Sequence, residues 1–297
     1  QGFAFQTFPG FIEKPTEKVI ISRQDVDKLP ENSLQFARIQ SERGIKGTYY
    51  FRAAPETWNV ETIREIYELG HEIGYHYEDL GVTAQRRKGA REGMGEWENG
   101  RRGEKHEKEL VDLAIISFSE NLEKLRKIVP VKTICMHGSP MSRWDSRLLW
   151  KYYDYHNFGI IVEPYFDIDF NEVLYLTDTG RRWDGVAFSV RDKVSCAGFR
   201  AQSENPYKDW KVKPVNFRND YYINQFRNLN TALRTPGLHS TSGIIKAAEE
   251  NRLPDKIMIT FHPQRWTNKP LPWAKELVWQ NLKNAIKYFL IIIRSER

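Results

Sequence analysis

Cysteine is scarce in this sequence, with two residues, Cys135 and Cys196, among 297. Two thiols are too few for a disulfide framework or for a zinc site built from four cysteines. The low count favours a reducing compartment. The first five residues contain neither an initiator Met nor a signal-peptide pattern, so we expect a cytoplasmic protein whose N-terminus has been trimmed.

Long apolar runs and a dominant charge are also missing. The longest apolar run, Phe289 to Ile293, is far shorter than the roughly 20 residues that span a bilayer, so we expect no transmembrane segment. Basic residues number 45 against 39 acidic ones. The densest basic stretch, from Arg86 to Lys108, is interrupted by Glu92, Glu96, Glu98 and Glu104, and no basic stripe interleaved with aromatic residues occurs. We therefore expect no nucleic-acid partner.

Short apolar runs alternate with amphipathic or loop segments along the chain. The length suits one large α/β domain, which we take to cover residues 1–297. Strands are expected at 19–22, 47–51, 71–76, 133–136, 159–162, 173–177 and 256–261. Helices are expected at 31–43, 60–69, 106–128 and 273–293. This alternation predicts a parallel sheet covered by helices, as a closed barrel or as an open doubly wound sheet.

One stretch interrupts the alternation. Residues 86–103 hold five glycines among many charged residues and follow the expected third strand. Glycine-rich charged segments are typical of loops. We predict a mobile insertion here, which would cover a site at the end of that strand.

Polar residues follow the expected strands at the point where each strand ends. They are Asp25 and Asp27, His76, His137, Asp178 and His262. Because parallel strands end on one face, and barrel enzymes carry their chemistry on that face, this pattern favours the barrel over the open sheet. A lone histidine in such a place is usually a hydrogen-bonded core residue, but three of them together indicate a site.

Carboxylate and imidazole groups suit a divalent metal site. In the pair Asp25 and Asp27, one carboxylate could bind a cation while the other acts as a base, or one could simply cap the next helix. His71 and His76 lie on opposite faces of a regular strand, and we expect a structural role for His71. Zinc and related ions activate water near neutral pH, so the set predicts a hydrolytic site.

At these positions the chain resembles the polysaccharide deacetylases of carbohydrate esterase family 4, in particular the group associated with bacterial surface-polysaccharide clusters. Gln24 to Asp27 is similar to the first motif of the family, and Gly70 to His76 to the segment that leads into the second. The remaining three motifs would fall at His137, near Asp178 to Trp183, and at His262. The resemblance spans most of the chain and implies a distorted (β/α)7 barrel.

The resemblance also implies an activity. It makes the chain a hydrolase that removes an N-acetyl group from an amino sugar in a polysaccharide or its precursor. Asp25 would be the general base, Asp27 and His76 would bind a divalent metal, with zinc the first expectation, and His262 would be the acid. The metal would polarise the acetamide carbonyl and bind the attacking water.

The chain departs from the family pattern at one ligand. The second motif normally supplies another His four residues after His76, and that position is Leu80. Asp79 or His137 could complete the metal site, and we prefer His137. The arginine that orients the base in the family then has no assigned counterpart, and three candidates for it are Arg23, Arg181 and Arg182.

Two other functions compete with the deacetylase. The first is a non-catalytic carbohydrate-binding barrel that has lost its metal together with the missing His. Tryptophan rings would then serve as platforms for sugars. The second is a metal hydrolase of a different amide or of an ester. The tryptophans considered as platforms are Trp144, Trp183, Trp210, Trp266 and Trp273.

Overall fold

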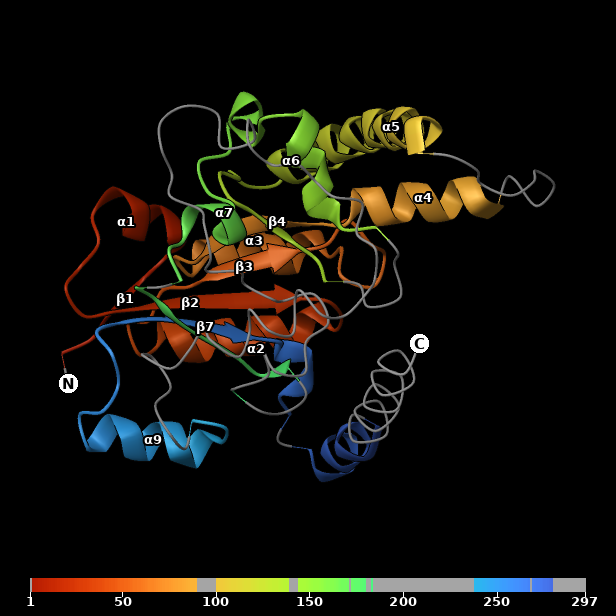
Figure 1. Ribbon diagram of the computed structural model, residues 1–297. Coiled ribbons are helices and arrows are strands. Elements are labelled where there is room, and N and C mark those ends of the chain that lie inside the picture. Colours follow the sequence, from red (N-terminus) through yellow and green to blue (C-terminus); the bar gives the residue numbers. More distant parts are fainter. Residues whose placement is uncertain are drawn as a thin grey trace, which may run out of the picture.

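The computed structural model describes residues 2–89, 100–138, 144–170, 172–179, 183, 238–267 and 269–279. Strands and helices alternate along these residues, and the arrows of the sheet point the same way (Figure 1). The strands are β1 (Ala4–Gln6), β2 (Val19–Val26), β3 (Thr48–Phe51), β4 (Glu72–Tyr77), β5 (Ile134–Met136), β6 (Leu174–Thr177) and β7 (Lys256–Phe261). The helices are α1 (Phe8–Glu13), α2 (Pro30–Ser41), α3 (Val60–Glu68), α4 (Asp79–Gly89), α5 (Gly100–Arg126), α6 (Leu149–Tyr152), α7 (Pro164–Asp167) and α9 (Thr241–Glu249).

All strand pairs are parallel, in the order β5-β4-β3-β2-β7-β6, with β1 beside the first half of β2. The sheet curls into a half-barrel, which confirms the α/β class and the parallel sheet. A bridge from Thr133 to Val162 extends the sheet beyond β5. Among the described residues, β5 and β6 are not paired with each other. Closure into a (β/α)7 barrel therefore stays a prediction.

The strands differ from expectation mainly in their ends. β7 has the expected bounds, but β2 continues to Val26, so that Asp25 lies within the strand rather than in a loop. The run at 159–162 forms only the bridge at Val162. β1 and α1 were not expected, because three and six residues are too short to show a clear periodicity.

Residues on alternate positions of each strand face either the inside of the curl or the helices. The inner core contains Ile21, Tyr50 and Met258, together with Phe8 and Phe11 of α1. α1 lies near the starting ends of the strands (Figure 1). The outer core lies between the sheet and α3 and α5, and a third cluster packs α9 against β6 and β7.

Gly74 of β4 makes room within this inner core. A Cβ at Gly74 would overlap the ring of Tyr50 on the neighbouring strand. Because Gly74 has no side chain, the Tyr50 ring can lie across β4 at that position. Gly74 is two residues before His76, so the ring and His76 are on the same face of the strand.

The predicted insertion at 86–103 is helical at both ends. Residues 86–89 belong to α4 and residues 100–103 begin α5, while 90–99 lie outside the described residues. The helix expected at 106–128 thus begins earlier, at Gly100. The C-terminal helix, expected at 273–293, begins at 270 and is helical through 279, while 280–293 lie outside the described residues. Within the part of the chain that the structure describes, no helix combines the length and apolarity needed to cross a membrane.

Candidate functional site

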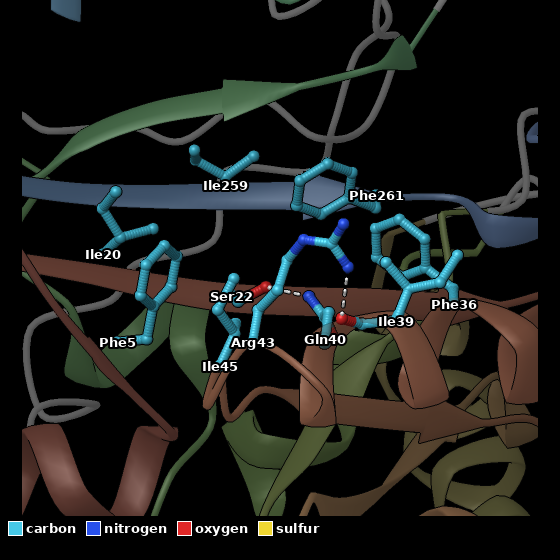
Figure 2. A pocket seen from close by; sticks show the side chains of 10 residues that line it. All are labelled: Phe5, Ile20, Ser22, Phe36, Ile39, Gln40, Arg43, Ile45, Ile259 and Phe261. Carbon is cyan, nitrogen blue, oxygen red and sulfur yellow. Dashed lines mark hydrogen bonds between the residues drawn. The ribbon is translucent and has the colours of Figure 1, made fainter.

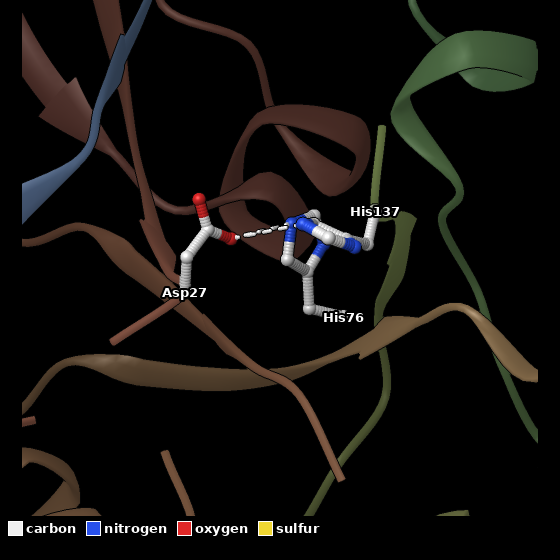
Figure 3. Close-up of side chains that lie close together, drawn as sticks. All are labelled: Asp27, His76 and His137. Atoms are coloured by element: carbon white, nitrogen blue, oxygen red, sulfur yellow. Dashed lines mark ion pairs between the residues drawn. The ribbon is translucent and has the colours of Figure 1, made fainter. Parts of the chain in front are cut away.

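Three side chains from three strand ends bring ligand atoms together. Asp27 follows β2, His76 belongs to β4 and His137 follows β5, and one donor atom of each lies within 4.8 Å of the others (Figure 3). Asp27 Oδ1 is 3.6 Å from His76 Nε2 and 3.5 Å from His137 Nε2. Two ligands that each lie about 2.1 Å from a tetrahedral ion are about 3.4 Å apart. The spacing therefore matches a shared cation.

The Asp27 carboxylate offers one oxygen for such an ion. Its Oδ1 atom is buried and accepts no hydrogen bond, which is costly for a polar atom unless a ligand occupies it. Its Oδ2 atom accepts a hydrogen bond of 3.0 Å from Gln264 Nε2. Gln264 thus holds the carboxylate with Oδ1 toward the two imidazoles. Sequence reasoning missed this residue, whose only signal is its place two positions after His262.

Both imidazoles present Nε2 to Asp27. The Nδ1–H group of His76 donates to the carbonyl of Cys135 over 2.9 Å, and His137 Nδ1 lies 2.8 Å from Glu78 Oε2. A hydrogen bond at Nδ1 leaves Nε2 free to act as a metal ligand. Burial, with the charge of His137, lowers the pKa of His76 well below its usual value, which keeps its ring neutral.

His137 is in a different electrostatic situation. Burial acts to lower its pKa, but the hydrogen bond to Glu78 and the charge of Asp27 outweigh burial and raise it. Burial acts to raise the pKa of Glu78, whereas His137 and Arg52 lower it to about 2. The Glu78 carboxylate is therefore charged beside the ring.

Asp25 is paired with a buried arginine rather than with a helix. Arg23 Nε and Nη2 donate to the two Asp25 oxygens over 2.7 Å each, and the two residues are 1% and 4% exposed. Burial acts to lower the Arg23 pKa, but the Asp25 charge raises it well above the usual value. α2 has Leu29 at its N-cap without a side-chain bond, so helix capping is wrong as an account of Asp25. Of the three arginine candidates, Arg23 contacts the carboxylate.

Arg181 and Arg182 lie outside the described residues, so their places are not compared with that of Arg23. The Asp25 Oδ2 atom is 3.8 Å from His76 Nε2. Asp25 is therefore beside the three ligand atoms without being one of that set.

His262 completes the other side of the cluster. Its Nδ1–H group donates to Asp178 Oδ1, and its backbone N–H donates to Asp178 Oδ2 over 3.0 Å. The His262 Nε2 atom lies 3.9 Å from Asp27 Oδ2. Burial and Arg265 act to lower the His262 pKa, but Asp178 reverses this and raises it. The raised pKa means that the ring keeps a second proton, on the Nε2 atom that faces Asp27, to a higher pH than an ordinary histidine does.

Asp178 is a strand-end residue to which the sequence pattern assigns no role. It follows β6, which is paired with β7, and this pairing brings it to His262. Burial acts to raise the Asp178 pKa, whereas His262 and Arg265 hold it well below the usual range. Arg265 Nη1 donates to Asp178 Oδ1 over 3.1 Å.

Asp79, the alternative third ligand, and His71 both have partners outside the ligand cluster. Asp79 accepts hydrogen bonds from Tyr75 Oη, Ser117 Oγ and Asn121 Nδ2 over 2.6, 2.9 and 2.8 Å, and Leu80 is fully buried in the outer core. His71 has the expected structural role, because its ring is bonded to the Gly47 N–H group and to the Ala37 carbonyl.

Trp266 contacts Asp178, the partner of His262. Its Nε1 atom donates to Asp178 Oδ2 over 3.2 Å, and the residue is 40% exposed. Trp183 is 6% exposed and donates to Thr241, which is typical of packing. Trp273 is 45% exposed at the start of the C-terminal helix, Trp144 packs partly buried against the outer core, and Trp210 lies outside the described residues.

A separate cavity of about 300 Å³ lies on the outer face of the sheet (Figure 2). Ile20 and Ser22 of β2 line it, whereas Arg23 and Asp25 point to the opposite face. α2 contributes Phe36 and Ile39 to its wall, and β7 contributes Phe261. The cavity is therefore not part of the ligand cluster.

No family model, no curated protein and no solved structure matches this chain.

Proposed function

We propose that this chain is a metal-dependent hydrolase that removes the N-acetyl group from an amino sugar in a polysaccharide or its precursor. The observation that carries the proposal is the buried, unbonded Oδ1 of Asp27 at 3.5–3.6 Å from two imidazole nitrogens. A carboxylate and two histidines suit zinc and other first-row divalent ions. The motif resemblance adds the substrate class and the closed (β/α)7 barrel.

Two paired residues beside the ligand set supply the proton transfers. An ion held by Asp27, His76 and His137 would polarise the acetamide carbonyl and make water acidic. Asp25, fixed by Arg23, is the base that takes the proton of the attacking water. His262, kept protonated by Asp178, is the acid that gives a proton to the leaving amine. The products are acetate and a free amino sugar.

The position of Trp266 supports a carbohydrate substrate. The residue is 40% exposed, and its Nε1 atom is bonded to Asp178, the partner of the proposed acid His262, so Trp266 is partly open to a ligand beside that acid. Aromatic rings with one polar edge are common where an apolar sugar face must be held.

The non-catalytic alternative depends on the missing histidine at Leu80. A ligand atom of His137 lies within 4.8 Å of the ligand atoms of Asp27 and His76, which supports a three-residue metal site without a histidine at Leu80. Hydrolysis of another amide or of an ester uses the same groups, and only the substrate assay separates these activities.

Metal binding is the first test. Protein purified without chelator should contain a divalent ion, or take one up when titrated with Zn²⁺ against a chromophoric chelator. The His76→Ala variant should lose this ion, whereas His156→Ala, at an exposed histidine bonded to Asp154, should keep it. A wild-type chain that binds no divalent ion would refute the proposal.

Activity is the second test. Acetate release should be measured on N-acetylglucosamine, its oligomers and a nucleotide-linked form, with acetylated peptides and acetyl esters alongside. Release from the esters or peptides alone would assign the site to a different bond.

A further inference from the structure

The two imidazoles of the ligand set are oriented in different ways. His76 is held by a backbone carbonyl of the adjacent strand, which the sheet itself fixes. His137 follows the three-residue strand β5, and its ring is held by the side chain of Glu78. A side-chain partner is free to rotate unless a further group fixes it, so the position of His137 depends on what holds Glu78.

Arg52 is that further group. Its Nε and Nη2 atoms donate to Glu78 Oε1 over 2.8 and 2.6 Å, which leaves Glu78 Oε2 for His137. Its Nη1 atom donates to the backbone carbonyl of Asp27 over 3.1 Å. The Arg52 and Glu78 side chains are 13% and 17% exposed, so water screens these bonds only partly.

Four strand ends meet in this arrangement. Arg52 follows β3, Glu78 follows β4, Asp27 follows β2 and His137 follows β5. The planar guanidinium directs its donors at fixed angles, so one side chain sets the position of Glu78 and of the Asp27 backbone together. Through Glu78, Arg52 affects the position of His137, and through the backbone carbonyl it affects the position of Asp27.

We propose that the Arg52–Glu78 pair positions His137 as the third metal ligand, in place of the histidine that Leu80 replaces. Glu78 fixes the proton on Nδ1 and the plane of the ring, so that Nε2 faces Asp27 Oδ1. Arg52 holds Glu78 in that orientation and ties it to the Asp27 backbone. Neither residue touches substrate. The inference rests on the proposed metal-dependent function.

The Glu78→Gln variant tests this directly. Its amide can accept from His137 only by turning its NH₂ group toward the guanidinium, so it cannot serve both partners. Carboxylate partners of metal-bound histidines contribute about 10- to 100-fold to metal affinity, and we expect the Kd for Zn²⁺ to rise by that factor. The matched control is Glu56→Gln, because Glu56 is the other carboxylate at Arg52, at 3.3 Å, and is 45% exposed. Its Kd should stay within about twofold of the wild type.

The Co²⁺ absorption spectrum separates positioning from general stability. A displaced ligand changes the position and intensity of the visible bands in protein saturated with Co²⁺, whereas a loss of stability alone leaves the bands of the folded fraction unchanged. We expect altered bands in Glu78→Gln and wild-type bands in Glu56→Gln.

Arg52→Met provides a second variant in case Glu78→Gln does not fold. It leaves the Glu78–His137 bond but removes the group that fixes it, so the Kd should rise by a smaller factor, about 3- to 10-fold. Wild-type affinity and bands in Glu78→Gln, or in Arg52→Met if Glu78→Gln does not fold, would overturn this inference and leave the metal-dependent function standing. A wild-type chain without metal would overturn both.

Discussion

Replacing Asp25 by asparagine separates the proposed base from the metal ligands. Arg23 is 1% exposed, two of its nitrogens are held by Asp25, and its Nη1 atom is buried without a partner. The asparagine side chain would accept one of the two hydrogen bonds and carry no charge. Removing one partner of a buried ion pair costs about 3–5 kcal/mol. The ring centroids of Tyr50 and Tyr165 lie 5.8 and 5.5 Å from the guanidinium carbon, and both rings partly stabilise the Arg23 charge that would remain without a partner.

We therefore expect the free energy of unfolding of Asp25→Asn to fall by about 3 kcal/mol, the lower end of that range, as measured by urea unfolding at neutral pH. Zn²⁺ affinity should persist, because Asp25 is outside the ligand set, while acetate release should fall by at least about 100-fold. The double variant Asp25→Asn with Arg23→Met removes both charges and should recover much of the lost stability. A single variant that keeps full activity, or that loses its metal, would refute the assigned role of Asp25.

Three further predictions concern the ligand, the substrate and the pH dependence of stability. His137→Ala should lose Zn²⁺ whereas Asp79→Asn should keep it, and chelator competition that shows equal affinity in both would contradict His137 as the ligand. Trp266→Ala should raise KM by about 2- to 10-fold relative to Trp266→Phe, which equally lacks Nε1 but keeps a ring, and equal KM values would exclude stacking. Burial raises the pKa of Glu163 to about 7 from 4.5, so the folded state binds the proton more tightly and loses stability as pH rises through this range, by about 3 kcal/mol in total. Burial raises the pKa of Glu72 to about 7 as well, so both proteins should lose stability between pH 5 and pH 8 in urea unfolding. The loss should be larger in the wild type than in Glu163→Gln, by most of the Glu163 contribution, and equal pH slopes would contradict the prediction.

Most of the candidate site residues could be predicted from their positions at the ends of strands. Asp27, His76 and His137 each follow or end an apolar run, and the period of two within parallel strands places such residues on one face. In the structure, one ligand atom of each of these three residues lies within 4.8 Å of the other two. Their roles in metal binding stay a prediction.

Partners that depend on strand order were harder to predict. Asp178 and His262 are 84 residues apart, and only the pairing of β6 with β7 brings them together. Arg23 and Asp25 lie two residues apart on one strand, so their pairing follows from the strand period once β2 is known to extend through both. The strand expected from the sequence ends at Ser22, and the pairing therefore could not be predicted from it.

The burial of Leu80 bears on how this site could have arisen or be altered. A histidine placed there by a single exchange would not rebuild the family pattern, because the side chain at this position is enclosed by the outer core rather than open to Asp27. The new imidazole would lose its hydration without gaining a ligand, at a cost of about 1–3 kcal/mol. Building a two-histidine motif on one turn would require the first turn of α4 to rotate as well, because Leu80 in that turn faces the outer core. The arrangement with His137 is thus separated from the common one by several coordinated changes.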